Sequence, residues 1–119
     1  MNYDIELNSL YICVKDMDRA VRFYEAILNH KVDMKDDVAS FFILKGFRFM
    51  LFHNQSVNEK VVYGDNCLPS FQVSNMESFL EKLEELNAPI EYPLTRINDN
   101  LVLEFKDPEG NDIEVYSRV

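Results

Sequence analysis

Apolar residues recur at helical spacing in two stretches of the chain, and a residue type that commonly caps helices precedes each stretch. The first stretch follows Asp16 and gathers on one helical face Ala20, Phe23, Tyr24 and Ile27. The second follows Asn75 and gathers Met76, Phe79, Leu80 and Leu83. Because Asp and Asn side chains accept hydrogen bonds from the first free amide groups of a helix, both residues are N-cap candidates. The pattern predicts two amphipathic helices.

Between and after these stretches, apolar and polar residues alternate, or β-branched and aromatic residues are frequent. Both patterns are typical of strands. The strong strand signals cover residues 7–14, 38–44, 47–53, 68–73, 101–105 and 112–117, and weaker ones cover 31–35 and 90–94. Each half of the chain is therefore predicted to run strand, helix, strand, strand, strand.

The two halves are related by an internal repeat. A shift of 59 residues lays Val14 on Val73, Asp16 on Asn75 and Met17 on Met76, and a shift of 64 lays Gly46 on Gly110 and Leu51 on Val115. We expect one domain over residues 1–119, with a first module at about 5–53, a linker at 54–66 and a second module at about 67–119. The linker is interpreted as a connection, with a lid as the alternative.

Composition narrows the class of protein. The 119 residues are 47% apolar and include nine Phe and six Tyr, enough for a core. The net charge of −9 argues against nucleic acid or anionic membrane as partner and favours a cationic or neutral ligand, unless it serves solubility alone. With no apolar run of membrane length and no signal-peptide pattern at residues 1–6, a cytoplasmic location is expected. Cys13 and Cys67 form no CxxC pair and are expected to be reduced.

The sequence from Asp107 to Asn111, Asp-Pro-Glu-Gly-Asn, predicts a sharp turn before the last strand. In that strand Ile113 and Val115 share one face, and Glu114 lies on the other. A carboxylate in the middle of a strand is costly to bury without a partner. Glu114 is therefore expected to face water, a counter-charge or a ligand.

The tandem βαβββ pattern, the opening sequence LYICVKDMDRAVRFY and the closing sequence DPEGNDIEV resemble the vicinal-oxygen-chelate superfamily. That superfamily includes glyoxalase I, ring-cleaving dioxygenases, fosfomycin-resistance enzymes and bleomycin-binding proteins. The resemblance covers essentially the whole chain. It implies an α+β fold in which two tandem modules form one curved mixed sheet around a central trough, and it implies a homodimer.

The resemblance also implies four metal-ligand positions on the trough strands. This sequence fills them with Ser9, Leu68, Met50 and Glu114. A catalytic divalent metal needs about three protein ligands, and only the glutamate is a usual one. His30 and His53 stand at positions that are not expected to face the trough. We therefore predict no metal and no other cofactor.

Strand alternation assigns further side chains to the trough. Its predicted lining is Ser9, Tyr11, Cys13, Arg48, Met50, Phe52, Leu68, Ser70, Gln72, Asp112, Glu114 and Tyr116. Apolar and aromatic walls with a few polar groups suit a small organic ligand. The leading hypothesis is metal-free binding of a small amphipathic or cationic molecule, as in the bleomycin-binding proteins that the sequence resembles.

Glu114 has three possible roles in such a trough. It could form an ion pair with Arg48, act as counter-ion to a cationic ligand, or act as a catalytic general base whose pKa is raised by apolar neighbours. The alternative functions are a metal-dependent glyoxalase-type lyase or isomerase, or a dioxygenase, with an atypical ligand set. A third option is a sensor module in which the trough has lost its ligand.

Overall fold

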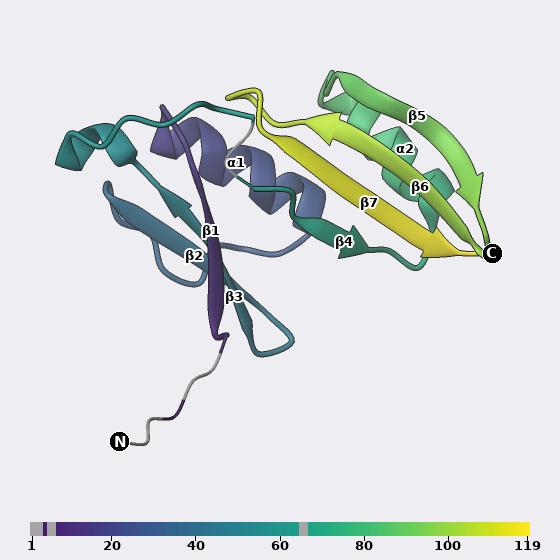
Figure 1. Cartoon of the computed structure of the whole chain (residues 1–119), viewed down its shortest axis with the longest axis horizontal. Helices are drawn as coiled ribbons and strands as arrows, with labels where there is room; N and C mark the ends of the chain where they lie inside the picture. The colour runs from purple at the N-terminus through teal and green to yellow at the C-terminus, as the bar shows by residue number, and fades with distance from the viewer. Residues whose placement is uncertain (1–3, 5–6, 65–66) are drawn as a thin grey trace.

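A computed structural model of the chain describes residues 4, 7–64 and 67–119. In chain order the elements of this part are β1 (Ser9–Cys13), α1 (Met17–Leu28), β2 (Ala39–Leu44), β3 (Phe47–Phe52), the 3-10 turn η1 (Asn54–Val57), β4 (Ser70–Gln72), α2 (Met76–Glu85), β5 (Ile90–Ile97), β6 (Asn100–Lys106) and β7 (Asp112–Arg118) (Figure 1). Within the described ranges, neither helix has the length and apolar character needed to cross a membrane.

Both helices begin where the sequence predicts. The Asp16 side chain accepts a hydrogen bond from the Arg19 amide at 3.0 Å, and the Asn75 side chain accepts one from the Ser78 amide at 3.0 Å. Each cap satisfies one of the amide groups that have no partner inside the helix. The two predicted N-caps are confirmed.

The strands form two mixed sheets. The first has the order β1-β3-β2 and the second β4-β7-β6-β5, with β1 parallel to β3 and β4 parallel to β7. The predicted α+β class is confirmed, but hydrogen bonding divides the expected single curved sheet into two. The reason is that β1 and β4 are both edge strands that pair only within their own sheets. Figure 1 shows α1 between the two sheets.

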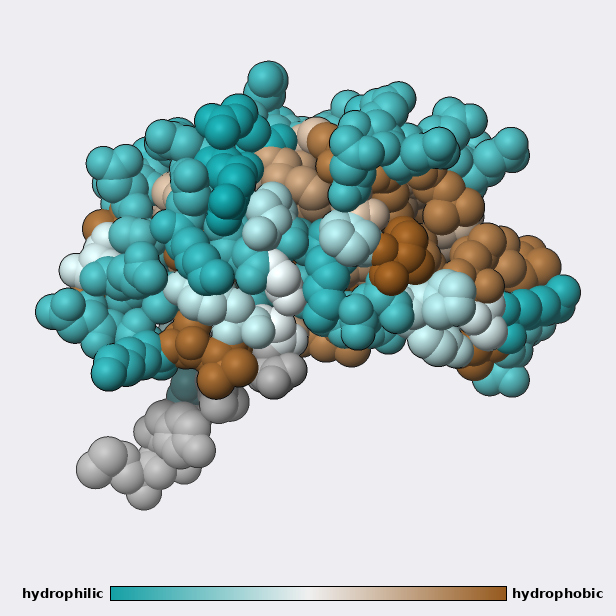
Figure 2. Space-filling view, turned by 90° about the horizontal axis from the view of Figure 1, so that it is seen from above, coloured by the Kyte–Doolittle hydropathy of each residue, from teal (hydrophilic) through white to brown (hydrophobic). Residues whose placement is uncertain are grey.

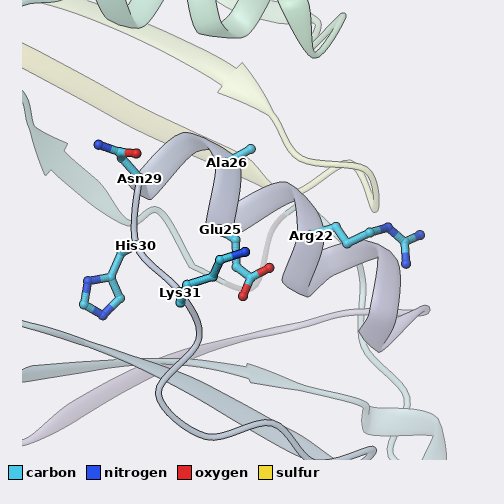
Figure 3. Close-up of a pocket in the computed structure, with 6 residues that line it drawn as sticks. All are labelled: Arg22, Glu25, Ala26, Asn29, His30 and Lys31. Atoms are coloured by element: carbon cyan, nitrogen blue, oxygen red, sulfur yellow. The ribbon is translucent and has the colours of Figure 1, made fainter.

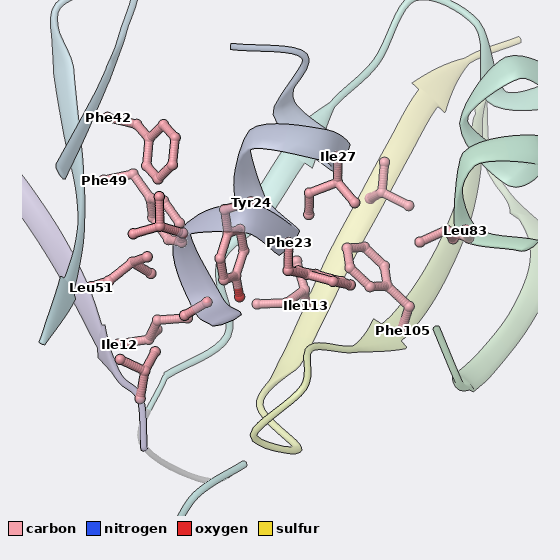
Figure 4. Packing of buried hydrophobic residues seen from close by; sticks show 14 of the residues in the cluster. Ile12, Phe23, Tyr24, Ile27, Phe42, Phe49, Leu51, Leu83, Phe105 and Ile113 are labelled. Carbon is pink, nitrogen blue, oxygen red and sulfur yellow. The ribbon is translucent and has the colours of Figure 1, made fainter. Parts of the chain in front are cut away.

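One hydrophobic core spans both sheets because α1 contributes to each side of it. The Tyr24 ring lies 5.2 Å from the ring of Phe49 in the first sheet, and the Phe23 ring lies 6.5 Å from Phe105 in the second. Figure 4 shows these side chains leaving opposite sides of α1. Phe49 also meets Phe71 of β4 at 5.3 Å, edge to face. Burying each large side chain contributes about 1.5–3 kcal/mol, so these contacts hold the two sheets together.

The strand predicted at 31–35 is wrong, and a single bridge between Met34 and Phe41 stands in its place. The Asp33 carboxylate explains the difference. It accepts a hydrogen bond from the Ile43 amide at 2.6 Å and lies 2.8 Å from His30 Nε2. A short polar side chain that binds nearby backbone amides competes with a strand ladder in this way.

Other strand boundaries differ by a few residues. The prediction 68–73 shortens to the three residues of β4, which follows Pro69, a residue that cannot donate a backbone hydrogen bond. The prediction 90–94 lengthens to Ile97. β5 is an edge strand with large apolar side chains more than a third exposed, namely Ile90, Tyr92, Leu94 and Ile97. Figure 2 shows hydrophobic surface at the right of the molecule, where β5 lies in Figure 1.

The predicted linker is held against the rest of the chain by hydrogen bonds. Tyr63 donates from its hydroxyl to Asn54 Oδ1 at 2.9 Å, and Asn54 Nδ2 donates to the Glu59 carbonyl at 2.8 Å. The Gly64 amide donates to Asn111 Oδ1 at 3.0 Å. The last two linker residues, 65 and 66, lie outside the described residues. The described linker is thus tied to the turn that precedes β7.

Candidate functional site

Except for Cys13, the predicted trough side chains are exposed or half-buried. On β7, Glu114 is half-buried, whereas its neighbours Ile113 and Val115 are completely buried. On β1, Tyr11 is 52% exposed next to buried Ile12. At these positions the exposure follows the alternation read from the sequence. We call this surface the open face, made up of Ser9, Tyr11, Arg48, Met50, Phe52, Leu68, Ser70, Gln72, Asp112, Glu114 and Tyr116.

Cys13 does not belong to the open face, although alternation assigns it there. The residue is 4% exposed, and its carbonyl accepts a hydrogen bond from Asn111 Nδ2 at 2.9 Å. Burial, with a smaller contribution from Glu59, raises the pKa of its thiol. A protonated and buried thiol is a structural group rather than a nucleophile or a ligand contact.

Glu114 has its partner on the neighbouring strand. The parallel register of β4 and β7 sets Ser70 opposite Glu114 and Gln72 opposite Tyr116. The Ser70 hydroxyl donates to Glu114 Oε1 at 2.7 Å, and the Tyr116 hydroxyl donates to Gln72 Oε1 at 3.3 Å. Ser70 therefore orients the carboxylate.

The proposed ion pair between Arg48 and Glu114 is not among the ion pairs of the described residues. The Arg48 guanidinium carbon instead lies 4.4 Å from the centre of the Phe41 ring, a cation–π contact. The physical reason is the division into two sheets, since Arg48 lies on β3 and Glu114 lies on β7. Beside Arg48, the first sheet offers an aromatic pair, Tyr11 and Phe52, with ring centres 5.5 Å apart.

Sequence reasoning missed a third carboxylate beside Glu114. Glu104 stands directly opposite it in the antiparallel register of β6 and β7. A hydrogen bond with Asp112, burial, and the charges of Asp112, Glu114 and Glu91 raise the pKa of Glu104 to about 6. The turn at 107–111 was the available signal, because it fixes which residues of the two strands face each other.

A hollow of about 450 Å³ reaches one of these carboxylates, Glu114. It is lined by Asn98, Asp99, Asn100, Val102, Glu114, Tyr116 and Arg118. These residues come from the turn between β5 and β6 and from β6 and β7, so the second sheet alone builds it. Its volume falls within the range of about 300–1,000 Å³ common for small-molecule sites.

The residues at the implied metal positions do not fit a catalytic divalent metal. Leu68 offers no donor, Met50 offers only a thioether, and Ser9 offers a neutral hydroxyl. In the described residues, no group of three or more His, Cys, Asp and Glu side chains is placed to hold a metal ion. His30 lies beside Asp33, and His53 Nδ1 is bonded to the Ser56 hydroxyl.

The turn before β7 is largely buried and is joined by hydrogen bonds to other parts of the chain. Asp107, which is 3% exposed, accepts hydrogen bonds from the Tyr24 hydroxyl at 2.8 Å and from the amides of Glu109 and Asn111 at 2.9 and 2.8 Å. Asn111 connects the same turn to Cys13 and Gly64. The motif therefore fixes β7 against α1, β1 and the linker, and through β7 it fixes Glu114.

A polar depression of about 400 Å³ at the end of α1 is a weaker candidate. Figure 3 shows that Arg22, Asn29 and His30 point in different directions, so the side chains do not converge on a common point. The Glu25 carboxylate accepts a hydrogen bond from the Val32 amide at 3.0 Å. We do not assign a function to this depression.

Two mixed sheets packed on a shared helix, with an acidic and aromatic face turned outward, define an α+β protein of the glyoxalase fold. The family model described as Glyoxalase/Bleomycin resistance protein/Dioxygenase superfamily matches residues 6–115. The chain belongs to this superfamily. The resemblance found in the sequence is thereby confirmed.

Individual relatives are distant. The metallothiol transferase FosB of Staphylococcus saprophyticus is 25% identical over 114 residues, which is 93% of this chain and 76% of that protein. A glyoxalase-related enzyme from Fulvimarina pelagi is 15% identical, with a TM-score of 0.78 over 95% of this chain and 88% of that one. A lactoylglutathione lyase from Agrobacterium tumefaciens is 18% identical, with a TM-score of 0.75 over 97% and 95%. The two structural likenesses show the fold alone.

Proposed function

We propose that this protein binds a small amphipathic organic cation on the open face, at Glu114 and without a metal. The observation that carries the proposal is that Glu114 lines a hollow of ligand size, with Glu104 opposite it on β6 and Asp112 two residues away on β7. A cluster of negatively charged carboxylates attracts cations, and the overall charge of −9 reinforces that attraction. Metal-free binding is favoured because the side chains at three of the four implied ligand positions are poor donors.

Both sheets contribute residues of the open face to the proposed ligand site. Glu114, held by Ser70, supplies the counter-charge, and the Tyr116 ring beside it supplies an aromatic wall for a cation. The first sheet supplies Tyr11 and Phe52, with further contacts from Ser9, Arg48 and Met50. Gln72 of β4 and Leu68, which precedes β4, add contacts from the second half of the chain. Cys13 is left out because it is buried.

We further propose that two copies of the chain form a homodimer that completes the ligand site. The hollow beside Glu114 is lined only by the second sheet, while Tyr11 and Leu68 leave 52% and 49% of their surface exposed. A partner chain would bring its own first sheet over this hollow and bury those side chains. Light scattering after size exclusion tests this point, and a monomer at all concentrations would contradict it.

A metal-dependent lyase or transferase is the second candidate. It is favoured by the similarity to FosB, whose name describes a metallothiol transferase, and by the fold shared with a lactoylglutathione lyase. In this alternative Glu114 would be a metal ligand or a general base. The donor set of the open face argues against it.

Calorimetric titration with benzyltrimethylammonium, benzoate and benzyl alcohol tests the first candidate. The cation is expected to bind, and the anion and the alcohol are expected to bind far more weakly. Glu114→Gln is expected to weaken the binding of the cation by about tenfold. Glu77→Gln, which removes one exposed charge from α2, is the matched control. Equal binding of the cation to both variants would contradict the role of Glu114.

Metal analysis after incubation with Zn²⁺, Ni²⁺, Mn²⁺ or Fe²⁺ separates the two candidates. Metal-free binding predicts no stoichiometric uptake. One tightly held ion per chain, lost in Glu114→Gln, would favour the enzyme. Turnover of methylglyoxal with glutathione would then be the next measurement.

A further inference from the structure

A second hollow, of about 440 Å³, lies between the two halves of the chain on the side of the helices. Its walls come from the end of α1, the β2–β3 hairpin, β4 with the residue after it, and α2. We call it the seam crevice, and its main apolar lining is Leu28, Ile43, Leu44, Phe71, Val73 and Phe79. Apart from Gln72, its lining shares no residue with the open face.

The walls of the seam crevice continue the hydrophobic core. Leu28, Leu44, Phe71, Val73 and Phe79 are partly buried and pack against the core cluster. Packed side chains of this kind form fixed walls, because core residues are locked in place by their neighbours. An apolar hollow of this volume suits the aliphatic part of a small ligand.

Lys45 supplies a positive charge to the crevice. It lies in the turn between β2 and β3 with a φ of 49°, it is exposed, and it also lines an adjoining hollow with Val73. Among the described residues, the ion pairs of the chain do not include Lys45. An ammonium group beside an apolar crevice favours an anionic head group.

The other ionisable groups near the crevice do not replace Lys45. His30 lines the crevice, and its Nε2 lies 2.8 Å from Asp33 Oδ2. The same carboxylate accepts the Ile43 amide, and these two bonds lower the pKa of Asp33. The negative charge of Asp33 is thus already engaged by protein donors, and Lys45 remains the cation that a ligand can reach.

We propose that the seam crevice binds a medium-chain aliphatic carboxylate, with its carboxylate on Lys45 and its chain against Leu44, Phe71 and Phe79. The site differs from the open face in position and in ligand charge. Because its walls come from both halves of the chain, an occupant stabilises their mutual arrangement. A ligand that binds only the folded chain also raises the melting temperature.

Titration of ¹⁵N-labelled protein with octanoate, followed by amide chemical shifts and by melting temperature, tests the proposal. Octanoate is expected to shift the amides of Leu28, Phe71 and Val73 and to raise the melting temperature. Octylammonium, which has the charge of the proposed open-face ligand, is not expected to shift these three amides. Lys45→Glu is expected to weaken the binding of octanoate by about tenfold or more. Lys60→Glu, the same charge change at an exposed linker residue, is expected to leave it unchanged.

Three results would overturn the proposal. They are the absence of any shift at millimolar octanoate, shifts confined to the open face around Tyr11 and Glu114, and equal affinities for Lys45→Glu and Lys60→Glu. Lys45→Gln removes the charge without reversing it, and is expected to give an intermediate loss. Since cation binding at Glu114 is measured with a different probe and variant, failure here leaves the proposed function untouched, and the reverse also holds.

Discussion

The carboxylate of Glu109, in the turn before β7, accepts a hydrogen bond from the guanidinium of Arg19 in α1. The Glu109 side chain is completely buried, whereas that of Arg19 is 44% exposed. The same carboxylate oxygen accepts the backbone amides of Lys15 and Asp16, each at 3.3 Å. A negative group at a helix N-terminus is favoured by the helix dipole. The turn near the end of the chain therefore secures the start of the first helix.

Removing Arg19 is expected to destabilise the fold, because a buried carboxylate loses its charged partner. Arg19→Met keeps the apolar stem and should cost about 1–3 kcal/mol in the free energy of unfolding, measured with urea. Arg22→Met, on the same helix and exposed, is the control. A double-mutant cycle with Glu109→Gln should show coupling of about 0.5–3 kcal/mol. Equal costs for the two arginines would contradict the interpretation.

Tyr24→Phe is expected to cost about 1–3 kcal/mol, because it removes the buried hydroxyl that donates to Asp107 and leaves the carboxylate short of one donor. The ring itself, packed against Phe49, is retained. Tyr92→Phe, at a residue 37% exposed, should change the unfolding free energy by less than about 0.5 kcal/mol. If both variants unfold at the same urea concentration, the hydrogen bond contributes nothing measurable.

Gly64→Ala and Gly46→Ala form a matched pair. Both glycines have positive φ, 98° and 83°, so either alanine is strained by about 1–2 kcal/mol. Only at Gly64 would the added Cβ meet another atom closely, the Gly110 carbonyl oxygen at 3.0 Å. Gly64→Ala is therefore expected to lower the melting temperature further than Gly46→Ala. The opposite order would show that the linker and the turn can separate at little cost.

Stability should depend on pH through Glu104. Its pKa of about 6 in the folded chain exceeds the ordinary 4.5, so the folded state binds this proton more tightly than the unfolded chain does. The contribution of Glu104 is therefore full below about pH 4.5 and is lost as pH rises through about 6. Glu104→Gln removes this loss and should raise the melting temperature more at about pH 7.5 than at about pH 4.5.

The size of that effect is limited because Glu104 is only half-buried, and we expect less than about 1 kcal/mol. The pKa values of Asp18 and Asp33 are lowered from the ordinary 3.8, so the titration of these two groups changes stability only in more acidic solution, outside this pH window. Glu77→Gln serves as the control for charge alone. A pH-independent difference between Glu104→Gln and the parent protein would contradict the raised pKa.

Much of the local structure follows from residues close together in the sequence. Asp16 caps α1 through an amide three residues away, and Ile113 and Glu114 face opposite ways because a strand alternates. The family resemblance adds the tandem arrangement. The strand at 31–35 fails because the side-chain hydrogen bonds of Asp33 outweigh a weak strand pattern.

The partners of the polar groups depend on residues far apart in the chain. Ser70 meets Glu114 across 44 positions, and Tyr24 meets Asp107 across 83. Periodicity assigns a face to a side chain but not a partner. It therefore could not show that Arg48 lies over Phe41, or that the surroundings of Glu104 raise its pKa to about 6.

The sequence by itself determined the helices, their caps, most of the strands and the outward direction of Glu114, because backbone geometry and capping depend on neighbours within about four residues. Only the tertiary structure decided that the strands form two sheets, that the turn at 107–111 is a buried lock, and that a crevice opens beside Lys45. These features arise from strand pairing and core packing, which bring together side chains that no local pattern connects.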